Sequence, residues 1–164
     1  MLHTERMHGT SWPQRIARVA LGAALLGAGI SHLTVGREEF LAQVPPWLPI
    51  APDLVVVGSG VVEIALGGAL IAFGRWRIPI GWATALFYLA IFPGNIAQFT
   101  EGRDGFGLDT DLARGIRLLF QPVLVAWALW STGAWSAYRA RGRSEPSDEP
   151  GHRAQNLDGG TAQS

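Results

Sequence analysis

LVVVGSGVVEIALGGALIAFG, residues 54–74, is the stretch that decides the fold. Its single charged residue is Glu63, and the other positions are aliphatic, small or aromatic apart from Ser59. A helix rises 1.5 Å per residue, so about 20 apolar residues cross the roughly 30 Å hydrocarbon core of a bilayer. A helix on the surface of a soluble protein keeps a polar face. Because this stretch has no such face, it predicts a membrane-spanning helix.

Three further stretches have the same character. They lie at residues 16–33, 78–98 and 115–138, and their only charged residues are Arg18 and Arg117. The sequence therefore predicts an all-α fold, an integral membrane four-helix bundle that forms one domain over residues 15–138.

The two ends of the chain differ from this domain. Residues 1–14 are expected to form a short cytoplasmic N-terminal segment. Residues 139–164 are rich in Arg, Ser, Asp, Glu, Gly and Pro. Such a segment buries too little apolar surface to fold alone, so we expect a disordered cytoplasmic tail.

Composition excludes several classes of function. The 164 residues have a net charge of zero, and a nucleic-acid binder normally has a basic face. The chain has no cysteine, which excludes disulfides, thiolate metal sites and a cysteine nucleophile. Gly58-x-Gly60 lacks the third glycine of a dinucleotide fingerprint, because Glu63 stands at that position. The sequence predicts no catalytic residue and no metal ligand.

Arginine distribution predicts the orientation. Every cation of the Lys and Arg class is Arg, and most of these arginines lie in the N-terminal segment, the turn at Arg75 and Arg77, and the tail. The opposite side has Arg37, Arg103, Arg114 and Arg117. Cytoplasmic loops carry the excess of positive charge, so we expect both termini in the cytoplasm and a multi-pass protein of a cell membrane.

Polar side chains within the predicted spans form the candidate ligand-binding site. They are His32, Glu63, Asn95, Gln98, Arg117 and Gln121. All six are expected at or above the membrane midplane on the outer side, because alternate helices run in opposite directions.

An ionised carboxylate at the bilayer centre costs at least about 2.5–3.5 kcal/mol. Glu63 is therefore expected to approach Arg117 or His32, while Asn95 and Gln121 complete the hydrogen bonds. Two interpretations remain open at this point. The cluster is either a buried polar clasp that fixes helix register, or a site for a small polar or quinone-like ligand.

Small residues and prolines indicate how the spans pack. Ala20, Ala24 and Ala28 recur every four residues in the first span, and Gly60 and Gly67 share a face of the second. Small residues let helices approach closely in lipid, so both stripes are expected at helix contacts. The proline-rich segment 34–53 is expected to form a short interfacial segment on the outer surface.

Several motifs, taken in order, resemble the DoxX-like family of small four-helix bacterial membrane proteins. They are Arg18 with Gly29-Ile30-Ser31-His32, Val44-Pro45 with Trp47-Leu48-Pro49, Gly58-Ser59-Gly60-Val61-Val62-Glu63-Ile64 with Gly67, Phe92-Pro93-Gly94-Asn95-Ile96, and Arg117 with Gln121-Pro122. The resemblance covers residues 15–135. Where many relatives have Ala, this chain has Gly94.

The resemblance implies a bacterial inner-membrane protein associated with a redox system. Some DoxX-named proteins are subunits of quinol oxidase or thiosulfate:quinone oxidoreductase systems. The expected function is that of a non-catalytic subunit of a membrane oxidoreductase, or of a partner that binds quinone or another small ligand. The oligomeric state remains open. His32 is the only histidine within a span, so we expect no redox centre of the chain's own. The alternatives are a small proton or solute transporter that uses Glu63, and a structural assembly factor.

Overall fold

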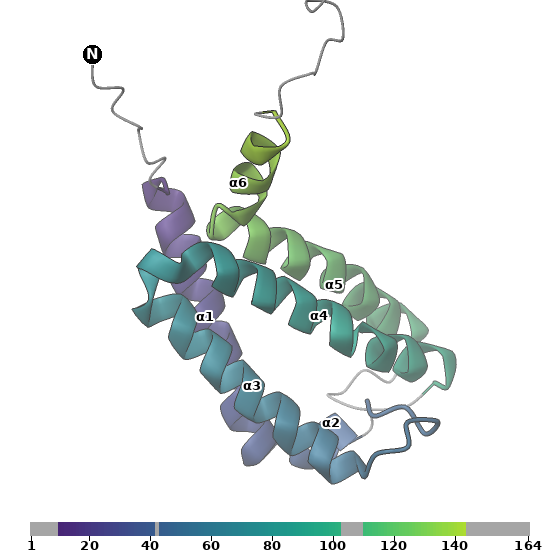
Figure 1. Cartoon of the computed structure of the whole chain (residues 1–164). Helices are drawn as coiled ribbons and strands as arrows, with labels where there is room; N and C mark the ends of the chain where they lie inside the picture. The colour runs from purple at the N-terminus through teal and green to yellow at the C-terminus, as the bar shows by residue number, and fades with distance from the viewer. Residues whose placement is uncertain (1–9, 42, 103–109, 144–164) are drawn as a thin grey trace, which may run out of the picture.

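The computed structural model describes residues 10–41, 43–102 and 110–143, and this part of the chain is helical without a β-strand. Its elements are α1 (Trp12–Leu33), α2 (Arg37–Leu41), α3 (Pro52–Ala72), η1 (Gly74–Trp76), α4 (Arg77–Thr100), α5 (Asp111–Ser131) and α6 (Ala134–Arg141), as Figure 1 shows. Among them α1, α3, α4 and α5 are long and apolar enough to cross a membrane. The structure thus confirms an all-helical chain with four helices of membrane-spanning length.

Large apolar side chains point outward on all four long helices. The exposed fraction is 58% for Ile16, 67% for Leu54, 61% for Leu86 and 72% for Leu119. A soluble monomer rarely exposes such surface over its whole length, whereas lipid tails solvate it. The exposed surface therefore supports a membrane environment for the bundle.

Two of the long helices begin earlier than the apolar stretches predicted, because polar residues cap their N-terminal ends. The backbone N–H of Ser11 donates to the side-chain oxygen of Gln14 at 2.9 Å, so α1 begins at Trp12 rather than at residue 16. The Thr110 hydroxyl accepts from the backbone N–H of Ala113 at 3.2 Å, so α5 begins at Asp111. These caps satisfy N–H groups that a helix end leaves without an intrahelical partner.

The second and third spans agree closely with the prediction. The second was predicted over residues 54–74, and α3 covers Pro52–Ala72. The third was predicted over 78–98, and α4 covers Arg77–Thr100.

The prediction of one continuous helix over residues 115–138 is wrong. Helix α5 ends at Ser131, and α6 begins at Ala134. Between them Gly133 has φ +73°, a left-handed conformation that glycine adopts without steric cost. The Thr132 hydroxyl donates to the Ala128 carbonyl at 2.7 Å. The chain therefore turns after Ser131, and Tyr138 belongs to a second, short helix.

The predicted terminal segments are only partly described. Residues 139–141 belong to α6, so the helical part of the chain extends beyond residue 138. The tail was predicted to be disordered over residues 139–164, and this prediction is wrong for residues 139–141, which are helical. Residues 144–164 of the predicted tail lie outside the described part. Residues 1–9 of the predicted N-terminal segment also lie outside it.

Glycine contacts hold α1 against α3. A Cβ added to Gly67 would lie 2.6 Å from the carbonyl oxygen of Gly22, and a Cβ on Gly29 would lie 2.6 Å from the carbonyl oxygen of Gly60. Both glycine pairs are buried. Close backbone approach of this kind is how small residues associate helices in lipid.

The alanine stripe predicted for the first span is not the contact surface. Ala20 and Ala24 are exposed and Ala28 is half-buried, whereas Gly22 and Gly29 face α3. The prediction for Gly60 and Gly67 is confirmed. Glycine permits a closer approach than alanine, so the seven-residue glycine spacing in both helices determines which face of α1 packs.

Helices α1 and α3 form one pair, and α4 and α5 form the second. The two pairs lie close together at one end of the bundle and diverge toward the other end (Figure 1). They meet toward the end of the bundle where η1 and α6 lie. There the Trp127 indole N–H donates to the Ala17 carbonyl at 3.0 Å, and the Gln14 amide donates to the Trp130 carbonyl at 2.9 Å. A buried core fills the junction and contains Leu21, Leu25, Leu70, Ala85, Tyr88 and Ala128. The two helix pairs separate toward the α2 end, which leaves room for a cavity.

Candidate functional site

A cavity of about 570 Å³ lies between the two diverging helix pairs. Helices α1 and α3 form one wall, α4 and α5 form the other, and the segment around Gln43 and Trp47 lies at its mouth. Leu21, Leu25 and Tyr88 belong to both the cavity lining and the buried core. The core therefore closes the cavity at one end, and the α2 side contains its mouth.

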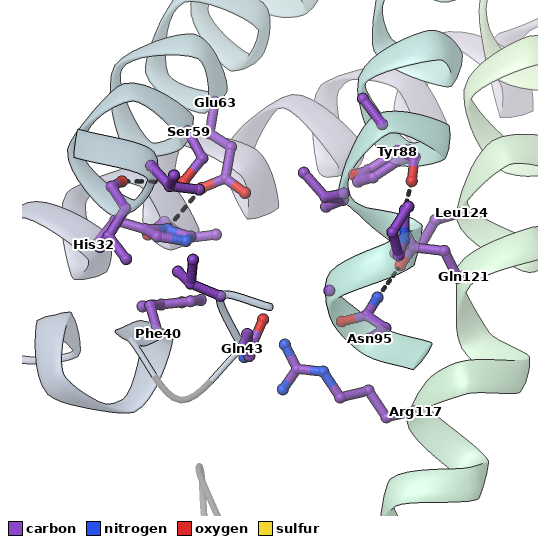
Figure 2. Close-up of a pocket in the computed structure, with 18 of the residues that line it drawn as sticks. His32, Phe40, Gln43, Ser59, Glu63, Tyr88, Asn95, Arg117, Gln121 and Leu124 are labelled. Atoms are coloured by element: carbon purple, nitrogen blue, oxygen red, sulfur yellow. Dashed lines mark hydrogen bonds and ion pairs between the residues drawn. The ribbon is translucent and has the colours of Figure 1, made fainter. Parts of the chain in front are cut away.

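His32 and Glu63 form the polar group of the first wall (Figure 2). The Nδ1 atom of His32 lies 2.8 Å from Oε2 of Glu63, and the exposed fractions of the two side chains are 8% and 7%. The same Nδ1 lies 2.9 Å from the carbonyl oxygen of Ala28. One nitrogen cannot donate linearly to both oxygens, and Oε2 receives no directed hydrogen bond within the described residues.

Helix geometry explains why residues at different depths meet. In an α-helix each Cα–Cβ bond tilts toward the helix N-terminus. Since α1 and α3 are antiparallel, the His32 side chain leans into the bundle and the Glu63 side chain leans toward the α2 end. The two side chains therefore lean toward each other. Of the two partners predicted for Glu63, the structure selects His32.

Gly60 and Phe40 hold the imidazole from two sides. A Cβ added to Gly60 would lie 2.8 Å from the His32 Cβ, so only glycine leaves the ring this position. The Phe40 ring of α2 stacks on the imidazole with centroids 3.3 Å apart and planes 21° apart. The histidine is therefore fixed by packing as well as by Glu63.

Asn95 and Gln121 form the polar group of the second wall. The Asn95 amide donates to the Gln121 side-chain oxygen at 3.0 Å, and the Gln121 amide donates to the Tyr88 carbonyl at 2.6 Å. Pro93, inside α4, has no N–H for the carbonyl four residues earlier. Gln121 thus bonds the backbone in the turn that the proline weakens. The prediction that Asn95 and Gln121 complete the hydrogen bonds around Glu63 is wrong. They bond each other and the Tyr88 carbonyl, and this network lies on α4 and α5.

Arg117 and Gln43 lie nearer the mouth (Figure 2). Arg117 extends from α5 toward Gln43 and is half-buried. The side-chain nitrogen of Gln43 is buried and has no hydrogen-bond partner in the described residues. Gly94 determines where this segment lies, because a Cβ there would be 2.8 Å from the Gln43 carbonyl oxygen.

Gln98 is the one predicted site residue that the cavity does not include. Its exposed fraction is 1%, and it does not line the cavity. His32, Glu63, Asn95, Arg117 and Gln121 all do. The structure therefore unites these predicted residues around one space.

Sequence reasoning missed Phe40, Gln43, Ser59 and Tyr88 among the lining residues. Tyr88 had a signal, because its phenol hydroxyl is one of the few polar groups of the third stretch. Gln43 and Phe40 had none, because segment 34–53 was expected on the surface rather than across the mouth. Within the described ranges 10–41, 43–102 and 110–143, no group of three or more His, Asp or Glu side chains could hold a metal ion.

Comparison with protein families places the chain. The family described as "Domain of unknown function (DUF8561)" matches residues 21–132. The chain belongs to the DUF8561 family. No curated protein and no solved structure matches it. The DUF8561 match contains both cavity walls and ends at Thr132, where α5 gives way to the turn before α6.

Proposed function

We propose that this protein binds a lipid-soluble ligand with a polar head between its two helix pairs. The observation that carries the proposal is the 570 Å³ cavity, whose walls are mostly apolar and which contains the His32–Glu63 and Asn95–Gln121 pairs. Small-molecule sites typically combine such an apolar lining with a few well-placed polar groups.

Two buried polar atoms indicate which hydrogen-bonding groups the polar head of the ligand has. Oε2 of Glu63 receives no directed hydrogen bond, and the side-chain nitrogen of Gln43 has no acceptor within the described residues. A buried polar atom that makes no hydrogen bond is costly. A head with one hydroxyl and one further oxygen would satisfy both atoms.

Quinones and their reduced forms are the ligand class that we favour. A quinone offers only acceptors, which suit Gln43 but not the Glu63 oxygen. The hydroxyl of the reduced quinol donates, so it is the better match for Glu63. The order of the motifs resembles that of DoxX-like proteins, which supports the same proposal. In it the chain acts as a non-catalytic partner of a membrane oxidoreductase.

The apolar core argues for binding over transport. A transporter that uses Glu63 needs a polar path on both sides of it. The cavity instead ends at Leu21, Leu25 and Tyr88, within the buried core. Ligand binding therefore ranks above proton or solute transport. A purely structural assembly factor would not explain two buried polar atoms that make no directed hydrogen bond.

The orientation is part of the proposal. The η1 and α6 end has most of the arginines of the described residues, including Arg15, Arg75, Arg77 and Arg139. By the positive-inside rule this end faces the cytoplasm. The cavity mouth then opens toward the outer side of a bacterial inner membrane.

Ligand identification tests the proposal directly. The full chain is purified in mild detergent and extracted with organic solvent, and the extract is analysed for isoprenoid quinones by mass spectrometry. Binding of a short-chain quinol is then measured by fluorescence quenching, because Trp47 and Trp127 line the cavity.

A matched pair of variants provides the control. Ala23 and Ala24 are adjacent exposed residues of α1, and only Ala24 lines the cavity. We expect Ala24→Phe to weaken quinol binding at least tenfold and Ala23→Phe to leave it within twofold. Equal binding by both variants, or no quinone or quinol bound to the wild-type chain, would overturn the proposal.

A further inference from the structure

The described arginines concentrate at the end of the bundle that holds η1. Arg15 and Arg18 come from α1, Arg75 from η1 and Arg77 from the start of α4. Helix α6 and the residues after it add Arg139, Arg141 and Arg143.

Acidic residues are missing from this end in the part of the chain that the structure describes. Glu38, Glu39, Asp53, Glu101 and Asp111 lie at the α2 end, and Glu63 lies in the middle of α3. The described part of the chain therefore has no Asp or Glu at the η1 end. Such an end attracts an anionic partner.

An apolar groove opens beside these arginines. It has a volume of about 490 Å³ and lies between the end of α3, η1 and the start of α4. Apolar side chains line it, among them Leu66, Phe73, Trp76 and Ile80. Phe73 and Trp76 are each 57% exposed, so the groove faces outward rather than into the core.

Two guanidinium groups flank η1 at the end of the groove. The Arg75 guanidinium carbon lies 5.7 Å from the ring centroid of Trp76, which itself lines the groove. On the α1 side, Nη1 of Arg18 donates to the Leu70 carbonyl and Nη2 lies 3.4 Å from the position of a Cβ on Gly74. The Nε of Arg18 is buried and has no partner in the described residues.

We propose that this groove is a binding site for an anionic phospholipid. An acyl chain lies in the apolar groove, and the lipid phosphate lies at Arg75, with Arg18 on the α1 side of η1. An acidic peptide would satisfy the arginines but not an outward-facing groove without polar lining groups. A zwitterionic lipid would fill the groove but gain less from Arg75 and Arg18, because its headgroup has no net charge. The site shares no residue with the cavity between the helix pairs, so it stands independently of the proposed ligand.

Lipid retention by the purified full chain tests this proposal. Native mass spectrometry compares bound phosphatidylglycerol with phosphatidylcholine of the same acyl chains. We expect at least fivefold more phosphatidylglycerol on the wild-type chain. Arg75→Gln is expected to abolish that preference, whereas Arg139→Gln, which removes the same charge from α6, preserves it. Circular dichroism verifies that each variant is folded.

A groove-filling variant tests the acyl-chain part. Ala83 lines the groove and Ala72, also exposed, does not. Ala83→Phe is expected to lower retention of both lipids at least fivefold, with Ala72→Phe unchanged. Equal retention of both lipids by the wild-type chain, equal losses in Arg75→Gln and Arg139→Gln, or no effect of Ala83→Phe would overturn the proposal.

Discussion

Gly60 of α3 lies directly against His32 of α1, so close that a Cβ on the glycine would come within 2.8 Å of the histidine Cβ. The glycine contact that joins these helices and the polar contact in the cavity are therefore one structural feature. Anything that separates α1 from α3 also moves the imidazole away from Glu63. Helix packing and the chemistry of the site are coupled through this pair.

Gly60→Ala is expected to destabilise the bundle and displace the imidazole. Overpacking a tight contact costs about 1–3 kcal/mol. Gly58→Ala is the matched control, because a Cβ at Gly58 would meet nothing within 4 Å. Alanine in place of a helical glycine is favourable by roughly 0.5–1 kcal/mol. Unfolding in mixed detergent micelles measures both free energies of unfolding, and a Gly60→Ala value equal to that of Gly58→Ala would show that the contact is not tight.

Gln121→Leu is expected to destabilise the α4–α5 pair. Gln121 bonds the Asn95 amide and the Tyr88 carbonyl, so its removal leaves two buried groups without this partner. Hydrogen bonds between membrane helices average about 0.6 kcal/mol and reach roughly 1.7 kcal/mol. The double variant with Asn95→Leu should cost less than the sum of the single variants. Strict additivity in this cycle would mean that the pair is not coupled.

Gly133→Ala is expected to destabilise the turn between α5 and α6. Gly133 has φ +73°, where a Cβ costs about 1–2 kcal/mol. Gly142 follows α6 with φ −69°, and a Cβ there would meet nothing within 4 Å. Gly142→Ala is therefore the control, with an expected change near zero in the free energy of unfolding. Equal effects of the two substitutions would contradict the left-handed turn.

The sequence was sufficient for the four apolar helices because length and missing charge decide them. It failed at Gly133, since the apolar composition continues through the turn and only the backbone conformation ends α5. It also selected the alanine stripe of the first span over Gly22 and Gly29, because periodicity alone does not say which small residue permits the closest approach.

The candidate site was predicted by residue type and completed by three-dimensional packing. Intramembrane polar residues are rare enough to select His32, Glu63, Asn95 and Gln121 directly. Their division into two groups was not predictable, because it depends on the divergence of the two helix pairs. Phe40 and Gln43 were also beyond reach, since a residue in an irregular segment carries no periodic signal for the surface it covers.

The His32–Glu63 pair permits a direct choice between a structural clasp and a ligand site. Removing one partner leaves the other buried polar side chain without it, which costs about 1–3 kcal/mol. Replacing both with apolar residues of similar volume is often neutral or stabilising, by about 1–4 kcal/mol. The double variant therefore distinguishes a structural clasp from a ligand site, whereas neither single variant does.

We expect His32→Leu/Glu63→Leu to unfold with a free energy at least equal to that of the wild-type chain, while His32→Leu alone is less stable. The double variant should also lose quinol binding at least tenfold, measured by quenching of the cavity tryptophans, since the acceptor for the ligand hydroxyl is gone. Asn95→Leu/Gln121→Leu is the control for polarity, because it removes the polar pair of the second wall and leaves Glu63 in place. A double variant that binds quinol normally yet unfolds more easily would identify the pair as a clasp, because the two side chains would then stabilise the fold without contributing to ligand binding.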